Sequence, residues 1–115
     1  MKYIKHYEAI EEDPQIGDYV ICEEFDIPGY PEDINIKNFV NNHIGKYIEN
    51  LEHNQEYSYM VQYDDVPKHI KLNFTMGEER EIIENARAMC RKEILYFSPN
   101  KEELKPYLQA NKYNL

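Results

Sequence analysis

Residues 41–63 read NNHIGKYIENLEHNQEYSYMVQY, and this stretch organises the predicted fold. In its second half, one side of an extended chain carries Tyr57, Tyr59, Val61 and Tyr63. A two-residue period of residues that favour strands predicts a β-strand. Residues 46–51 are also strand-like, and the polar residues 53–56 favour a turn between the two strands. Strands this close in sequence pair most simply as an antiparallel hairpin, which needs neighbouring strands or a covering helix to be stable.

Two elements are predicted before this hairpin. Residues 19–22 (YVIC) follow a Gly-Asp turn and are apolar on both faces of an extended chain, which predicts a central strand. A short helix is predicted to begin at Ile34, with Asp33 as its cap and Gly45 as a left-handed stop. Its apolar face follows the helical spacing i, i+3, i+4, i+7, i+8 through Ile36, Phe39, Val40, His43 and Ile44.

The part of the chain after the hairpin is less regular. Apolar and polar residues alternate over residues 70–76, which predicts another strand. Residues 80–92 fit either a helix or a last strand, and residues 92–97 favour a short turn or helical piece. Ser98 followed by proline favours the start of a C-terminal helix. Pro106 lies inside that helix and is expected to kink it or divide it into two short turns.

Composition limits the classes of function. The chain has 115 residues, which favours one domain over residues 1–115, and its net charge of −9 disfavours binding to nucleic acid or to an anionic membrane. The same charge permits a basic partner. No apolar run approaches membrane length and no signal-peptide pattern is present, so we expect a soluble intracellular protein. Cys22 and Cys90 lack CxxC spacing and are expected to be reduced structural thiols.

Residues that could carry chemistry do not form a known motif. The four histidines have no zinc-type spacing, and His43 is expected to pack on the helix face, so no metal and no cofactor are predicted. A Cys–His nucleophile pair would need a spatial proximity that sequence does not reveal. The acidic pairs at residues 23–24 and 64–65 could act in acid–base catalysis, but acidic pairs in turns are usually solvated. We therefore expect a protein that is not an enzyme.

Two binding surfaces are predicted instead. The first is a tyrosine face that could form a peptide-binding groove, or could simply cover the core: Tyr19, Tyr47, Tyr57, Tyr59 and Tyr63. The second is an acidic surface that could imitate a phosphate backbone and fill a basic groove on another protein, or could simply be solvated: Glu23, Glu24, Asp26, Glu78, Glu79, Glu81 and Glu84.

The order of several short motifs resembles small uncharacterised proteins of bacteriophages and large DNA viruses. These motifs are GDYV, NNHIGK, MVQY, VP, RKEILYFSPNKEEL and KYNL, and they cover most of residues 17–115. The strand series also resembles SH3-like barrels, in which a GDYV-type strand opens the barrel and a later IGK strand pairs with it. The acidic residues 77–85 and Pro106 depart from this pattern. Neither resemblance implies catalytic residues in this chain.

These observations predict an α+β, mostly β domain. We expect a small SH3-like barrel of about five strands, with a short helix before the central hairpin and a C-terminal helix. The expected function is that of a non-catalytic viral accessory protein in the cytoplasm of the host cell. It would bind and block a basic host protein, as some anti-CRISPR inhibitors of host defence do. The alternative is an SH3-like peptide-binding module, and an enzyme is third.

Overall fold

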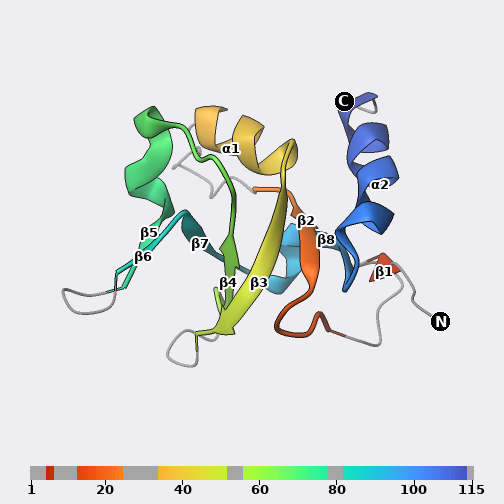
Figure 1. Ribbon diagram of the computed structural model, residues 1–115, viewed down its shortest axis with the longest axis horizontal. Coiled ribbons are helices and arrows are strands. Elements are labelled where there is room, and N and C mark those ends of the chain that lie inside the picture. Colours follow the sequence, from red (N-terminus) through yellow and green to blue (C-terminus); the bar gives the residue numbers. More distant parts are fainter. Residues whose placement is uncertain (1–4, 7–12, 25–33, 52–55, 78–81, 114–115) are drawn as a thin grey trace.

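A computed structural model describes residues 5–6, 13–24, 34–51, 56–77 and 82–113 of this chain. The fold is α+β with more strand than helix, as predicted (Figure 1). The strands are β1 (Lys5–His6), β2 (Tyr19–Cys22), β3 (Ile44–Asn50), β4 (Tyr59–Gln62), β5 (Thr75–Met76), β6 (Ile83–Glu84), β7 (Ala86–Met89) and β8 (Ile94–Ser98). The helices are α1 (Ile34–Asn41) and α2 (Lys101–Tyr113), with 3₁₀ segments η2 (Lys68–Phe74) and η3 (Arg91–Glu93).

The main sheet is antiparallel and has the strand order β1-β8-β2-β3-β4-β7. The central position predicted for residues 19–22 is confirmed, because β2 lies between β8 and β3. The predicted hairpin is confirmed as β3–β4, in which Lys46 pairs with Gln62 and Tyr47 with Val61. The GDYV and IGK segments pair as expected, with Val20 opposite Gly45.

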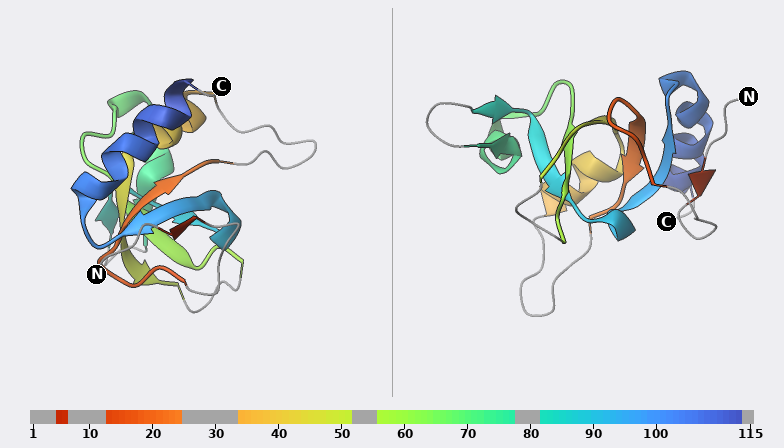
Figure 2. Two further views of the ribbon diagram at one scale, coloured as in Figure 1. Left: turned by 90° about the vertical axis from the view of Figure 1, so that its right-hand side faces the viewer. Right: turned by 90° about the horizontal axis from the view of Figure 1, so that it is seen from below.

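The edge strands of the main sheet are β1 and β7, and β8 is the strand next to β1. β7 and β8 lie at opposite sides of the strand order, yet only Cys90 and η3 separate them along the chain. The sheet must therefore curve strongly for the chain to pass from one side to the other (Figure 2). Closure of this sheet into a barrel would require its edge strands, β1 and β7, to pair, and this pairing is not found among the residues described. The α+β class of the fold is established, and the closed barrel stays a prediction.

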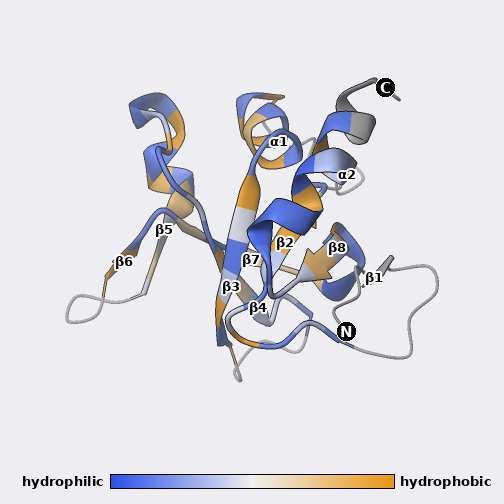
Figure 3. Ribbon diagram, turned by 45° about the vertical axis from the view of Figure 1, so that its right-hand side comes forward, coloured by the Kyte–Doolittle hydropathy of each residue, from blue (hydrophilic) through white to orange (hydrophobic). Residues whose placement is uncertain are grey.

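The helices cover different sides of β2. The predicted apolar face of α1 is confirmed for Ile36, Phe39 and Val40, which are buried in one cluster with Val20 and Cys22. Ile21 points to the other face of the strand and is fully buried, and α2, which contacts β2, carries the equally buried Leu104. Hydrophobic and hydrophilic residues alternate along α2 and η2, as expected of elements with one buried side (Figure 3).

The predicted strand over residues 70–76 is mostly a 3₁₀ segment. Only its last two residues form a strand, β5, which pairs with β6 in a separate small sheet. Ile70 and Phe74 are buried while Leu72, midway between them, is 90 % exposed. In a 3₁₀ segment successive side chains point in three directions rather than to two opposite faces. Leu72 therefore points away from the core although the apolar residues alternate in the sequence. Segment η2 and the small β5–β6 sheet lie at the far end of the molecule from α2 (Figures 1 and 2).

Two further predictions of secondary structure are wrong. α1 ends at Asn41, and Gly45 lies inside β3, so Gly45 is not the helix stop. His43 follows the helix and stacks on Phe39, with 4.1 Å between ring centroids. Residues 94–98 are a strand rather than a turn or helical piece, whereas the alternative of a strand near residues 86–89 is correct.

The start of α2 is shifted from the prediction. Asn100 rather than Ser98 caps the helix, because its Oδ1 accepts from the Glu102 amide at 3.0 Å. Ser98 is buried at the end of β8 and supports the cap, since its Oγ accepts from the Asn100 amide and donates to Glu103 Oε2. Pro106 lies within one continuous helix, Lys101–Tyr113.

Candidate functional site

The five predicted tyrosines do not share one face. Tyr19 pairs with Lys46 of β3, and its neighbour Val20 points into the core cluster, so Tyr19 lies on the outer face of β2. There the Lys46 ammonium lies 5.6 Å from the centre of the Tyr19 ring. Tyr47 and Tyr63 belong to the core cluster on the inner face, and Tyr59 packs against that cluster. The structure therefore separates Tyr19 from the other tyrosines of β3 and β4.

Two of the inner tyrosines fill the core. Tyr47 is 3 % exposed and Tyr63 is 2 % exposed. The Tyr63 ring makes edge contacts with Phe39 and Phe74, with centroid separations of 5.5 and 5.8 Å. Burial removes both residues from the predicted tyrosine-lined surface. Tyr57 and Tyr59, both half-buried, are the members of the inner set that still reach the surface.

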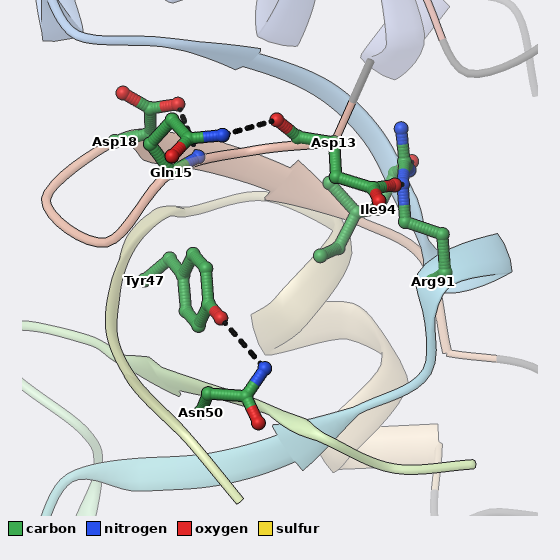
Figure 4. A network of polar contacts seen from close by, with 7 residues as sticks. All are labelled: Asp13, Gln15, Asp18, Tyr47, Asn50, Arg91 and Ile94. Carbon is green, nitrogen blue, oxygen red and sulfur yellow. Dashed lines mark hydrogen bonds and ion pairs between the residues drawn. The ribbon is translucent and has the colours of Figure 1, made fainter. Parts of the chain in front are cut away.

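Polar and aromatic side chains meet at one end of the β3–β4 hairpin. The Tyr47 and Tyr59 rings lie 5.1 Å apart, and Asn50 Nδ2 donates to the Tyr47 hydroxyl at 3.2 Å (Figure 4). Arg91 Nε donates to Asp13 Oδ1 at 2.9 Å beside these residues. Burial raises the pKa of Tyr59, the Asp13 carboxylate raises it further, and the Arg91 guanidinium opposes the change. Its hydroxyl is consequently neutral at physiological pH.

Hydrogen bonds along the chain hold Asp13 and Arg91 in place. The Gln15 amide donates to Asp18 Oδ2 at 2.8 Å, and Gln15 Nε2 donates to the Asp13 carbonyl at 3.3 Å (Figure 4). Arg91 Nη1 donates to the Ile94 carbonyl at 3.1 Å. The turn before β2 is thereby linked to η3 and the start of β8.

Tyr57 lies close to several acidic groups. Burial raises its pKa, and Coulombic repulsion from Glu93, Cys90, Glu56 and Glu24 adds to the effect in that order. The β4–β7 register explains this proximity, because Tyr59 pairs with Met89 and so brings the residues before β4 toward the start of η3. We call Glu56, Tyr57, Tyr59 and Asp13 the tyrosine end.

Glu24 is not part of an acidic surface. Its side chain is 5 % exposed and accepts a short charge-assisted hydrogen bond from Arg87 Nε. Arg87 Nη1 also donates to the Asn73 carbonyl at 3.0 Å, and its guanidinium lies 5.7 Å from the centre of the Phe74 ring. The ion pair therefore connects the end of β2 to β7 and η2. The prediction that Glu24 lies on the binding surface is wrong, because the residue is buried and paired.

The other predicted acidic residues are dispersed. Glu23 is half-buried, and its amide donates to the Glu93 carbonyl at 2.8 Å. Glu84 is exposed and lies 3.9 Å from the Lys71 ammonium. Asp26, Glu78, Glu79 and Glu81 lie outside the described residues. Sequence reasoning gave no role to Arg87 or Arg91, because their partners Glu24 and Asp13 lie 63 and 78 positions away in the sequence. It also missed Glu93, whose carboxylate accepts from the Cys90 amide.

Glu93 and the two thiols lie together at the end of β2. Glu93 is 3 % exposed, and its Oε1 accepts from the Cys90 amide at 3.0 Å, which closes the η3 turn. Burial raises the pKa of the Cys22 thiol far above its ordinary value, and the neighbouring Tyr63 hydroxyl opposes this to a smaller extent. Burial also raises the pKa of Cys90. Both thiols are free and protonated at neutral pH, which disfavours a role as nucleophile.

The two cysteines should differ strongly in reactivity. We expect N-ethylmaleimide at pH 8 to modify Cys90, which is partly exposed, about 100-fold faster than Cys22, which is 1 % exposed and reacts only after local opening. Intact-mass and peptide mass spectrometry over time measure both rates. A control in guanidinium chloride should abolish the difference. Equal rates in the folded protein would contradict the buried position of Cys22.

A metal or membrane role receives no support from the part of the chain described. No three His, Cys, Asp or Glu side chains within it are placed to hold a metal ion. None of its helices is both long and apolar enough to cross a membrane. Comparison of the chain with protein-family models, curated proteins and solved structures finds no match.

Proposed function

We propose that this chain is a non-catalytic binding protein that occupies a basic surface of a host protein and blocks it. The proposal rests on the negative charge of the protein's described surface. Exposed carboxylates outnumber exposed cations among the described residues: Asp13, Glu49, Glu56, Asp64, Asp65, Glu84 and Glu102 against Lys46, Lys68, Lys92 and Lys105. This excess agrees with the net charge of −9. Such a surface attracts cationic partners and speeds their association.

The state of the buried ionisable groups supports a role without catalysis. Cys22 is buried and protonated, Glu24 is paired with Arg87, and Glu93 accepts a hydrogen bond that closes the η3 turn. A general base or nucleophile must reach a substrate and change its protonation state near working pH. These groups instead perform structural tasks.

The viral accessory role, including inhibition of a host defence, rests on the sequence resemblance described above. The compartment we propose is the cytoplasm of the host cell. The free thiols of Cys22 and Cys90 support it, because disulfides are rare in that compartment.

The second candidate is an SH3-like peptide-binding module. The pairing of β2 with β3 and the return of β8 beside β2 favour it. The dispersal of the tyrosines weighs against a long groove, because Tyr47 and Tyr63 are buried and Tyr19 lies on the outer face.

Capture from host lysate at two salt concentrations tests the proposal. We expect the tagged protein to retain a partner with a basic surface at 50 mM salt and to release most of it at 500 mM, because exposed charges are screened. A matched charge-reduced variant, Glu49→Gln with Glu84→Gln, should capture less at low salt while keeping its melting temperature. Capture that is indifferent to salt, or a partner without a basic surface, would overturn the electrostatic mechanism.

A further inference from the structure

Segment η2 covers aromatic side chains of the core. Its residue Phe74 is fully buried and meets the Tyr63 and Phe39 rings edge-on, with centroid separations of 5.8 and 5.4 Å. Ile70 is the other buried residue of η2, while Leu72 between them is exposed. The seven residues of η2 therefore contact the core through two buried side chains, one of which lies directly on the aromatic rings.

The secondary structure of this part of the chain is weak by itself. Runs of 3₁₀ helix longer than about three or four residues are uncommon because their hydrogen-bond geometry is poor, and η2 has seven residues. Pro67, which precedes η2, supplies no side-chain cap. β5 and β6 form a separate two-stranded sheet, which is marginal without support. Residues 66–77 and 82–84, which we call the lid, are therefore held mainly by contacts with the rest of the molecule.

Two residues in the left-handed backbone conformation bracket the lid. Asp65 has a φ of 54° and Asn85 a φ of 61°, and these are the non-glycine residues with positive φ in the part of the chain that the structure describes. Asp65 directly precedes the lid, and Asn85 lies between β6 and β7. The Tyr63 amide donates to the Asn85 carbonyl at 2.7 Å, which brings the two connections together. Because a side chain disfavours this conformation, its occurrence at both connections points to positions that absorb a change of backbone angles.

One side chain of the main sheet holds the lid. Arg87 of β7 donates from Nη1 to the Asn73 carbonyl at 3.0 Å, and its guanidinium lies 5.7 Å from the centre of the Phe74 ring. Its Nε donates to Glu24 at the end of β2, so the guanidinium is anchored on the main sheet. Both contacts with η2 come from this one residue, and movement of the lid would break them together.

We propose that the lid opens as one unit about hinges at Asp65 and Asn85, and that Arg87 is its latch. The parts of the lid move together, because the Lys71 ammonium on η2 lies 3.9 Å from the Glu84 carboxylate on β6, and β6 pairs with β5. Opening uncovers the aromatic rings beneath η2 while the main sheet stays folded. This conformational device goes beyond the proposed binding function and does not depend on it.

Hydrogen exchange of the full chain, followed by mass spectrometry in a series of low guanidinium chloride concentrations, tests the opening. We expect the amides of residues 68–76 to exchange together and at least about tenfold faster than those of β2 and β3. Their exchange should also depend less on denaturant, because opening the lid exposes less surface than global unfolding does. Equal rates and equal denaturant dependence in the two groups of amides would overturn the lid, as would independent exchange of the individual amides within residues 68–76.

A matched pair of variants tests the hinge at Asn85. Asn85→Ala should speed the exchange of residues 68–76 about fivefold, because alanine tolerates the left-handed conformation less well than asparagine and opening relieves this strain. Asn85→Gly should change the rate less than about twofold, because glycine adopts this conformation freely. Similar rates in the two variants would rule out the hinge. If circular dichroism shows that Asn85→Ala does not fold, the comparison of lid and sheet amides in the wild-type protein still decides the proposal.

A second pair of variants tests the latch. Arg87→Lys keeps a positive charge beside Glu24 but lacks the forked donors and the planar group that contact η2. We expect the amides of residues 68–76 to exchange about tenfold faster in this variant. Lys105→Met on α2 breaks an ion pair that lies outside the lid and should leave their rate within about twofold of the wild type. An unchanged rate in Arg87→Lys would remove Arg87 as the latch.

Discussion

Gly45→Ala is expected to destabilise the protein by about 2–3 kcal/mol, as overpacking of a dense core does. Gly45 is buried in β3, and a Cβ placed there would first meet Val61 Cγ1 and then the Tyr63 ring carbons Cε1 and Cζ at 2.9 Å. Neither neighbour can move freely, since Val61 is fully buried and Tyr63 is packed between Phe39 and Phe74. Thermal unfolding should show a melting temperature lower by roughly 10 °C.

A second substitution separates this overpacking from any other effect of the alanine. Val61→Ala removes the nearest methyl group, so the double variant should be more stable than the sum of the two single changes by about 1 kcal/mol. Urea unfolding of all four proteins gives the coupling energy. A Gly45→Ala protein that melts within about 2 °C of the wild type would contradict the close approach of β3 to these side chains.

Arg87→Met is expected to have the largest effect, a loss of about 3–5 kcal/mol. The change leaves the buried Glu24 carboxylate without its guanidinium and also removes the donor to the Asn73 carbonyl. An uncompensated buried charge costs far more than the intact pair contributes. Urea unfolding at pH 7 measures the loss. Because the pair is largely buried, 500 mM salt should change the result little.

Two control variants sharpen this result. Replacing both partners, Glu24→Leu with Arg87→Met, should recover most of the stability, because no unpaired charge then remains. Lys105→Met breaks an exposed ion pair with Glu102 and should cost less than about 0.5 kcal/mol. If Arg87→Met were as mild as Lys105→Met, the Glu24–Arg87 pair would not be buried as the structure has it.

The tyrosine end shows how far the candidate site could be predicted from sequence. Alternation over residues 57–63 correctly placed Val61 and Tyr63 on one face, and Tyr59 packs against it. It did not reveal which of these side chains would be covered. Tyr63 is sealed by α1 and η2, whereas Tyr59 lies where the sheet ends. Coverage depends on elements that are distant in sequence, and a period of two carries no information about them.

Local patterns determined the elements whose burial follows a regular period. The apolar run at 19–22 identified β2, the spacing of Ile36, Phe39 and Val40 identified α1, and the proximity of two strand-like runs identified the β3–β4 hairpin. Each of these depends on contacts within a few residues or on one short connection. Chain composition likewise determined the acidic character, which is a sum over residues and does not depend on the fold.

Tertiary structure decided the features that join distant segments. It placed β8 beside β2, although 75 positions separate the paired residues Ile21 and Tyr96 and no local pattern marked residues 94–98 as a strand. It converted the alternating residues 70–76 into η2, since only the position of the core shows that Leu72 points outward. It also brought Arg87 to Glu24 across 63 positions, because the partner of a buried charge is chosen by strand order and not by neighbouring residues.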